Sequence, residues 1–134
     1  MSKNKHNQHL GSGVDRSDTR IDQTGEVFTP VELCIKMVNK IPINDLKNSK
    51  STFLDPAAGN GNFMIVLLEK LSEYHSTEYI LDHMLYAVEL MEDNHKEMCE
   101  RLGVPVTHPH YVCHDALTYD YSFGEPVGVE AYFT

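Results

Sequence analysis

Apolar residues along this chain follow two different periods, and their order predicts strands that alternate with helices. A short apolar run at residues 52–54 leads into a glycine-rich turn, and residues 63–74 after it are apolar on nearly every side. A helix of that kind is expected to pack on a sheet. The same patterns predict two more strands and one more helix downstream, over residues 85–88, 111–113 and 91–102. The chain is therefore expected to have an α/β fold with three to four mostly parallel strands and flanking helices.

The stretch Thr29-Pro30-Val31-Glu32 predicts the start of a further helix. The hydroxyl of Thr29 would accept a hydrogen bond from the amide of Glu32, and Pro30 suits the first helical position because it has no amide hydrogen. Apolar residues at helical spacing give this helix one apolar stripe, formed by Val31, Cys34, Ile35 and Val38. We expect the helix to end before Ile41-Pro42.

Residues 1–23 are predicted to form a disordered N-terminal arm, and residues 24–134 the folded domain. Only three residues of the arm are apolar enough to bury, which does not offset the entropy lost on ordering. The four Lys and Arg residues of the arm are interpreted as solvating charges rather than nucleic-acid contacts. The remainder of the chain carries seven Lys and Arg against seventeen acidic residues, within a net charge of −9. So acidic a domain is expected to bind DNA only weakly, or through a partner chain.

The cysteines and histidines indicate neither a disulfide framework nor a metal site. The three cysteines are odd in number and lack C-x-x-C spacing, which favours a reducing cytoplasm. Four residues of metal-binding types lie close together in sequence at a spacing that fits no zinc motif, namely His108, His110, Cys113 and His114. No apolar run approaches the ~18 residues of a membrane-spanning helix, so no membrane partner is expected.

The glycine-rich turn is the clearest candidate for a ligand site. Gly59 and Gly61 permit a tight turn, and without a Cβ they let backbone N–H groups approach a ligand at the start of a helix. Asn62 is predicted to cap that helix. Many strand-to-helix turns carry glycine merely to reverse the chain, so the pair alone leaves both interpretations open.

Two motifs around this turn favour the ligand-site interpretation over a simple chain reversal. The run Asp55-Pro56-Ala57-Ala58-Gly59-Asn60-Gly61 with Phe63 resembles the S-adenosylmethionine-binding motif of the adenine-N6 DNA methyltransferases. Thr24-Gly25-Glu26-Val27-Phe28-Thr29-Pro30 is similar to the extra motif that precedes the first strand in that family. The resemblance covers about residues 24 to 120. It implies a truncated Rossmann-like methyltransferase fold, S-adenosylmethionine as cofactor, and a link to the DNA methylation of restriction–modification.

The resemblance also implies a role for individual residues. Asp55 would face the ammonium group of the cofactor, Glu89 would accept from two ribose hydroxyls, and Asp115 would accept from the exocyclic amine of adenine. The alternative for each acid is a purely structural cap. The expected cofactor contacts are Phe28, Thr29, Asp55, Ala57, Gly59, Asn60, Gly61, Phe63, Glu89, Leu90, Met91, Asp115 and Ala116.

The sequence contains no Asn-Pro-Pro-Tyr or Asn-Pro-Pro-Phe loop, which grips the flipped adenine in that family. The chain is therefore expected to bind S-adenosylmethionine or S-adenosylhomocysteine without methylating DNA alone, either as a fragment or as a short protein, and no catalytic residue is assigned. One alternative is a cofactor sensor, or a subunit of a split methyltransferase completed by a partner chain. Another is an enzyme that consumes the cofactor by a different route.

The strand at residues 53–54 should lie near an edge of so small a sheet. An apolar edge with unpaired amides invites pairing with another chain. Residues 127–133 are apolar enough to form a fourth strand that covers this edge, in the same chain or exchanged with a twofold mate. This pattern predicts a homodimer.

Overall fold

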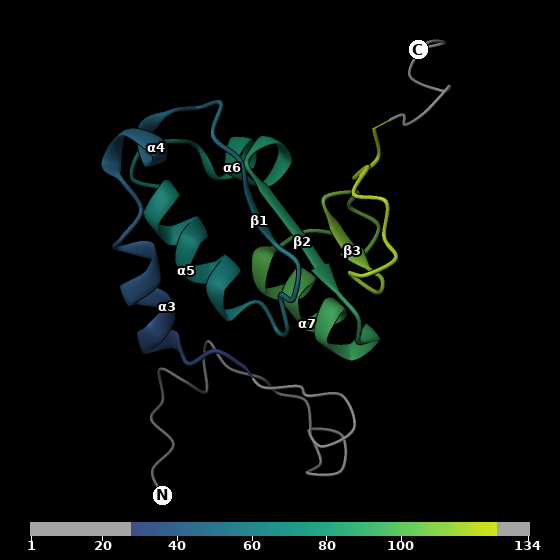
Figure 1. The fold of residues 1–134 in the computed structure, drawn as a ribbon. Helices are drawn as coiled ribbons and strands as arrows, with labels where there is room; N and C mark the ends of the chain where they lie inside the picture. Colours follow the sequence, from purple (N-terminus) through teal and green to yellow (C-terminus); the bar gives the residue numbers. More distant parts are fainter. Residues whose placement is uncertain (1–27, 126–134) are drawn as a thin grey trace, which may run out of the picture.

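Three parallel strands form one open sheet in the computed structural model, which describes residues 28–125 (Figure 1). The strands are β1 (Phe53–Asp55), β2 (Leu85–Glu89) and β3 (Tyr111–Cys113), in the order β1-β2-β3. Phe53 lies opposite Leu85, and Ala87 opposite Tyr111. Because parallel neighbours need crossover connections, helices link the strands. The predicted α/β fold with parallel strands is confirmed.

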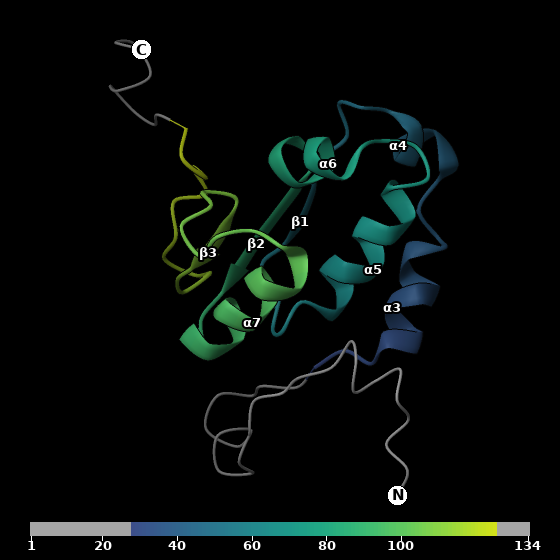
Figure 2. The ribbon, with the colours of Figure 1, turned by 180° about the vertical axis from the view of Figure 1, so that it is seen from behind.

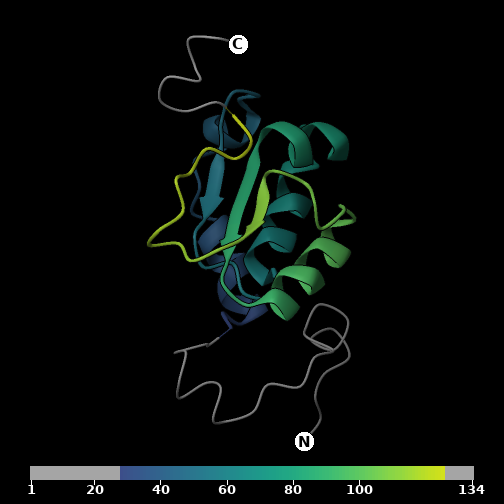
Figure 3. The same ribbon diagram turned by 90° about the vertical axis from the view of Figure 1, so that its right-hand side faces the viewer.

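The described residues contain five helices, α3 (Val31–Val38), α4 (Ile43–Lys47), α5 (Asn62–Leu71), α6 (Thr77–His83) and α7 (Glu92–Leu102). The sequence patterns predicted α3, α5 and α7 but neither α4 nor α6, and α5 ends earlier than expected. Helices α5 and α7 pack on one face of the sheet (Figures 2 and 3). No helix in residues 28–125 has the length and apolarity needed to cross a membrane.

The core lies between the sheet and these helices. Helix α5 buries most of its length there, as its nearly continuous apolar sequence predicts. The middle strand β2 is buried along most of its length, as expected for a strand with neighbours on both sides. The residues that meet here without solvent exposure include Met64, Leu67, Leu71, Leu85, Ala87, Met98 and Tyr111. A sheet held this firmly fixes the positions of its strand ends.

Two predicted helix caps are wrong. Pro30, not Thr29, is the N-cap of α3, and no side chain caps that helix; the carbonyl oxygen of Pro30 accepts the amides of Leu33 and Cys34. Gly61 is the N-cap of α5, so Asn62 is already helical and does not cap it. Both side chains were assigned from local spacing alone. The Asn62 side chain instead bonds to distant parts of the chain, as the site geometry below shows.

The second face of the sheet is covered only in part. Residues 114–125 run along it (Figure 3), where the ring of Tyr86 stacks on His110 at 4.0 Å between centroids and meets Phe123 edge-on at 5.0 Å. Leu54 of β1 is 46% exposed, and β1 is an edge strand of the sheet that the described residues form. The predicted arm (residues 1–23) and the predicted fourth strand (residues 127–133) lie outside the described residues.

Candidate functional site

The glycine-rich loop leaves the end of β1 and folds back against β2. Asp55 Oδ1 accepts the amide of Ala57 at 3.0 Å, which closes the first turn. The amide of Ala58 then donates to the carbonyl oxygen of Val88 on β2 at 3.0 Å, and that of Gly61 donates to the carbonyl oxygen of Ala58 at 3.0 Å. Local bonds and one bond to the neighbouring strand thus fix the path of the loop into α5.

Close packing explains both glycines. Gly59 and Gly61 have φ values of +56° and +92°, a backbone conformation that residues with a Cβ rarely adopt. A Cβ on Gly59 would lie 3.0 Å from the Phe28 ring, and one on Gly61 would lie 2.9 Å from Cγ of Met98 on α7. The ring of Phe28 therefore lies over the loop, and α7 lies directly behind it.

Glu89, at the end of β2, joins the loop to the start of α7. Its Oε1 accepts the amide of Gly59 at 2.8 Å, while its Oε2 accepts the amide of Met91 at 2.9 Å and the side-chain amide of Asn94 at 3.2 Å. The side chain is only 7% exposed. A carboxylate has about four acceptor positions. Glu89 thus performs the structural capping considered from the sequence and retains acceptor capacity for one more donor.

A hollow opens between the loop and the segment before α3. It encloses about 260 Å³ of space, including space open to solvent. Asn60 is only 2% exposed, and its side-chain amide makes no hydrogen bond with the part of the chain that the structure describes. Because that volume includes open solvent, the hollow is smaller than a typical small-molecule pocket of roughly 300–1,000 Å³, and it could hold only part of a nucleoside-sized ligand. Its lining residues are Phe28, Thr29, Asp55, Ala57, Ala58, Gly59, Asn60, Asn62 and Phe63.

Asp55 supplies the acidic group of this hollow. Burial raises the pKa of its carboxyl above the usual value, the Ala57 amide partly opposes that effect, and the charge of Glu89 raises the pKa further. A raised pKa means that the carboxylate takes up a proton at a higher pH than a free aspartate does. On acidification, its attraction for a cationic group is therefore lost at a higher pH than that of a free aspartate.

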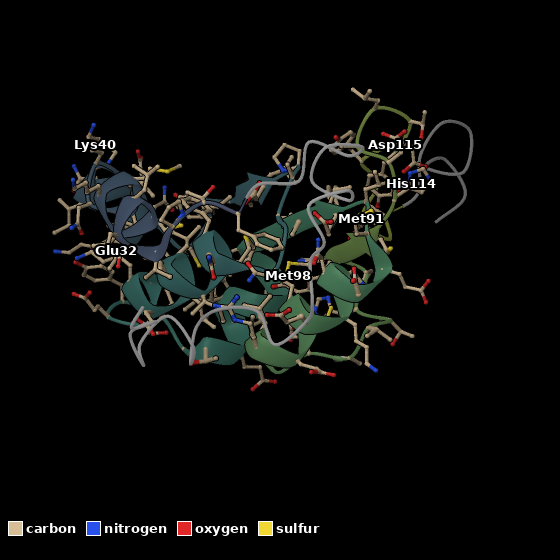
Figure 4. The ribbon with its side chains drawn as sticks, turned by 90° about the horizontal axis from the view of Figure 1, so that it is seen from below. Glu32, Lys40, Met91, Met98, His114 and Asp115 are labelled. Atoms are coloured by element: carbon tan, nitrogen blue, oxygen red, sulfur yellow. The ribbon has the colours of Figure 1, made fainter. Side chains whose placement is uncertain are left out.

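The remaining predicted contacts lie at the carboxyl ends of β2 and β3, outside the hollow. Leu90 is 57% exposed, and Oδ1 of the exposed Asp115 accepts the amide of Leu117 at 2.9 Å in a local turn that also holds Ala116. Figure 4 views the strands from the end toward which they point. Met91 and Asp115 lie on one side of this view, and α3, marked by Glu32 and Lys40, lies on the other.

The structure therefore divides the predicted residues into two groups. Seven of them line the hollow, and Gly61, Glu89, Leu90, Met91, Asp115 and Ala116 do not. Among residues 28–125, no group of His, Cys, Asp and Glu has an arrangement that could hold a metal ion. His108, in the cluster considered from the sequence, instead pairs with Asp82 at 2.8 Å.

Sequence reasoning missed four residues of this region, Ala58, Asn62, Asn94 and Arg101. Nη1 of Arg101 donates to the carbonyl oxygen of Asn60 at 2.7 Å and to Oδ1 of Asn62 at 3.0 Å. Nδ2 of Asn62 donates to the carbonyl oxygen of Thr29 at 2.9 Å. Asn94 and Arg101 lie two turns apart on α7, so they share one face of the helix that follows Glu89. This helical spacing is the signal by which the sequence could have placed both of them beside the loop.

Comparison with known protein families gives a match to the part of the chain that contains this site. The family described as N-6 DNA methylase matches residues 16–101, which is more than half of the chain. The match begins within the predicted arm and ends at Arg101, so it contains the loop, Glu89 and the whole hollow, while Asp115 lies beyond it. No curated protein and no solved structure matches the chain. The family match includes every element that builds the hollow, and the chain belongs to the N-6 DNA methylase family.

Proposed function

We propose that this chain binds S-adenosylmethionine, and its demethylated product S-adenosylhomocysteine, across the hollow and the adjoining strand ends. The observation that carries the proposal is the glycine loop beside a buried strand-end carboxylate, Glu89, in a member of a DNA methylase family. When bound, this cofactor supplies a methyl group on a cationic sulfur. A donor and an acceptor on Asn60, both without partners among the described residues, fit a polar ligand in the hollow.

The size and charge of the hollow support one orientation of the ligand. The hollow is too small for the whole cofactor, so we assign it to the methionine end, with Asp55 facing the ammonium group and Phe28, Thr29 and Asn60 around it. The remaining acceptor position of Glu89 would take a ribose hydroxyl. The adenine would then lie against the exposed Leu90, near Met91 and Asp115.

We further propose that transfer to adenine in DNA, of the restriction–modification kind, needs groups beyond these 134 residues. The sequence has no Asn-Pro-Pro-Tyr or Asn-Pro-Pro-Phe loop, and its net charge of −9 opposes binding to phosphates. These two facts favour a base-gripping loop and DNA contacts that lie outside the given residues, in a longer chain or in a partner chain. A cytoplasmic location belongs to the same proposal, because all three cysteines are free.

Titration calorimetry tests the binding proposal directly. We expect micromolar dissociation constants for S-adenosylmethionine and S-adenosylhomocysteine, because the loop, Asp55 and Glu89 offer polar partners to both. ATP is the control ligand, since its triphosphate would lie where the methionine end is proposed, against the negative charge of Asp55, and ATP should not bind. Absence of heat with the two methionine-bearing ligands at millimolar concentration would contradict the proposal.

We also propose a homodimer that forms through the exposed edge strand β1. Leu54 is 46% exposed there, and unpaired edge amides favour pairing with a second chain. Light scattering at high micromolar concentration is expected to give the mass of two chains. Leu54→Lys, which places a charge beside that edge, should shift the protein to one chain, whereas Lys36→Gln on α3 should not. A wild-type monomer under these conditions would rule the dimer out.

A further inference from the structure

One face of α7 supports the cofactor loop at three successive points. Asn94, Met98 and Arg101 are separated by four and three residues, so they lie along one stripe of the helix. Asn94 donates to Glu89, Met98 packs behind Gly61, and Arg101 donates to Asn60 and Asn62. Of these three, only Arg101 carries a charge, and nothing in the proposed function gives it a role.

Arg101 holds one peptide unit of the loop in a single orientation. Its Nη1 donates at 2.7 Å to the carbonyl oxygen of Asn60, while the amide at the other end of that peptide, on Gly61, donates to Ala58. With both ends bonded, the peptide unit cannot rotate without breaking a hydrogen bond. Asn60, whose side chain lines the hollow, is therefore fixed through its own backbone.

The same guanidinium is also linked, through Asn62, to the segment before α3 on the other side of the hollow. Arg101 Nη1 also donates to Oδ1 of Asn62 at 3.0 Å, and Nδ2 of Asn62 donates to the carbonyl oxygen of Thr29 at 2.9 Å. Thr29 belongs to the segment before α3, and Asn60 to the glycine loop. One side chain of α7 thus links the two segments between which the hollow opens.

The guanidinium is held in a partly buried place. Burial lowers its pKa from the usual value, and the charge of Glu97 opposes that effect. Its Nη2 is buried and has no hydrogen-bond partner among the described residues. An arginine remains protonated even so, and its bonds to uncharged acceptors are strengthened where water is excluded. A shorter apolar residue at this position would avoid the desolvation cost but could not donate the hydrogen bonds to Asn60 and Asn62.

We propose that Arg101 is a positioning residue for the part of the site that receives the methionine end of the ligand, acting through Asn60, Asn62 and Thr29. This inference rests on the proposed function. The adenosine end would contact Glu89, Leu90, Met91 and Asp115, none of which bonds to Arg101. Loss of Arg101 should therefore weaken the binding of a ligand that carries the amino-acid group and leave the binding of a ligand that lacks it nearly unchanged.

Calorimetry with two ligands tests this division. S-adenosylhomocysteine has the amino-acid group, and 5′-methylthioadenosine keeps the adenosine and the sulfur without it. In Arg101→Gln we expect the dissociation constant of S-adenosylhomocysteine to rise about tenfold and that of 5′-methylthioadenosine to change by less than about twofold. The matched control is Lys96→Gln, a cation on the exposed side of α7, which should change neither.

A second variant, Asn62→Ala, breaks the link to Thr29 without removing a buried charge, and it replaces Arg101→Gln if that variant does not fold. It should show the same preference between ligands, and losses in the double variant should be smaller than the sum of the single losses. Equal weakening of both ligands would reduce Arg101 to a general stabiliser, and unchanged binding of both would remove it from the site. A wild-type protein that binds neither ligand would overturn the proposed function, and this inference with it.

Discussion

Glu89→Ala is expected to weaken S-adenosylmethionine binding by at least tenfold and to lower the free energy of unfolding by about 3 kcal/mol. The carboxylate accepts from the amides of Gly59 and Met91 and from the side chain of Asn94, and it is 7% exposed. Its removal leaves three donors without their partner in a place that water reaches poorly. The proposed acceptor for a ribose hydroxyl is lost in the same step.

Calorimetry measures the first effect and urea denaturation the second. Glu89→Gln keeps the shape of the side chain but replaces one acceptor oxygen with a donor NH2 group. That group would face the amide of either Gly59 or Met91, so we expect losses of affinity and of unfolding free energy between those of the wild type and of Glu89→Ala. Glu100→Ala is the matched control, because Glu100 is an exposed acid on α7 whose removal should change the unfolding free energy by less than about 0.5 kcal/mol. Unchanged affinity in Glu89→Ala would exclude Glu89 from the cofactor site and leave it only its structural role.

Gly61→Ala is expected to destabilise the fold by about 3 kcal/mol, which corresponds to a fall in Tm of more than about 10 °C. Two costs add in this variant. A side chain at a φ of +92° costs roughly 1–2 kcal/mol, and a Cβ placed 2.9 Å from Met98 Cγ and 3.3 Å from Met98 Cα must displace α7, at roughly 1–3 kcal/mol. Thermal unfolding followed by circular dichroism measures the sum.

Gly103→Ala separates the two costs. Gly103 ends α7 with a φ of +77°, and a Cβ there would meet nothing within 4 Å, so only the backbone cost of roughly 1–2 kcal/mol applies. In Gly61→Ala/Met98→Ala the smaller side chain makes room, and the double loss should be less than the sum of the single losses. Equal losses in Gly61→Ala and Gly103→Ala would show that the approach of α7 to the loop contributes nothing.

The three strands, three of the helices and their order along the chain follow from the sequence alone. The apolar run before Asp55, the continuous apolar character of residues 63–71 and the glycine at 103 are local signals, and the three strands, α5 and the end of α7 lie where these signals predict. The glycine loop with its flanking motif also predicts the family, because residues adjacent in sequence carry that signal. Such features need no knowledge of what packs against them.

Tertiary structure alone decides which groups these residues bond. Local spacing predicts that Asn62 caps a helix. In the structure its side chain instead accepts a hydrogen bond from Arg101, 39 residues later, and donates one to the carbonyl oxygen of Thr29, 33 residues earlier. The amide of Gly59 bonds to Glu89, 30 residues away, and Gly61 must lack a Cβ because α7 passes behind it. A polar side chain has several local and distant partners of similar energy, and the packing of α7 against the loop determines which of them lies within hydrogen-bond distance.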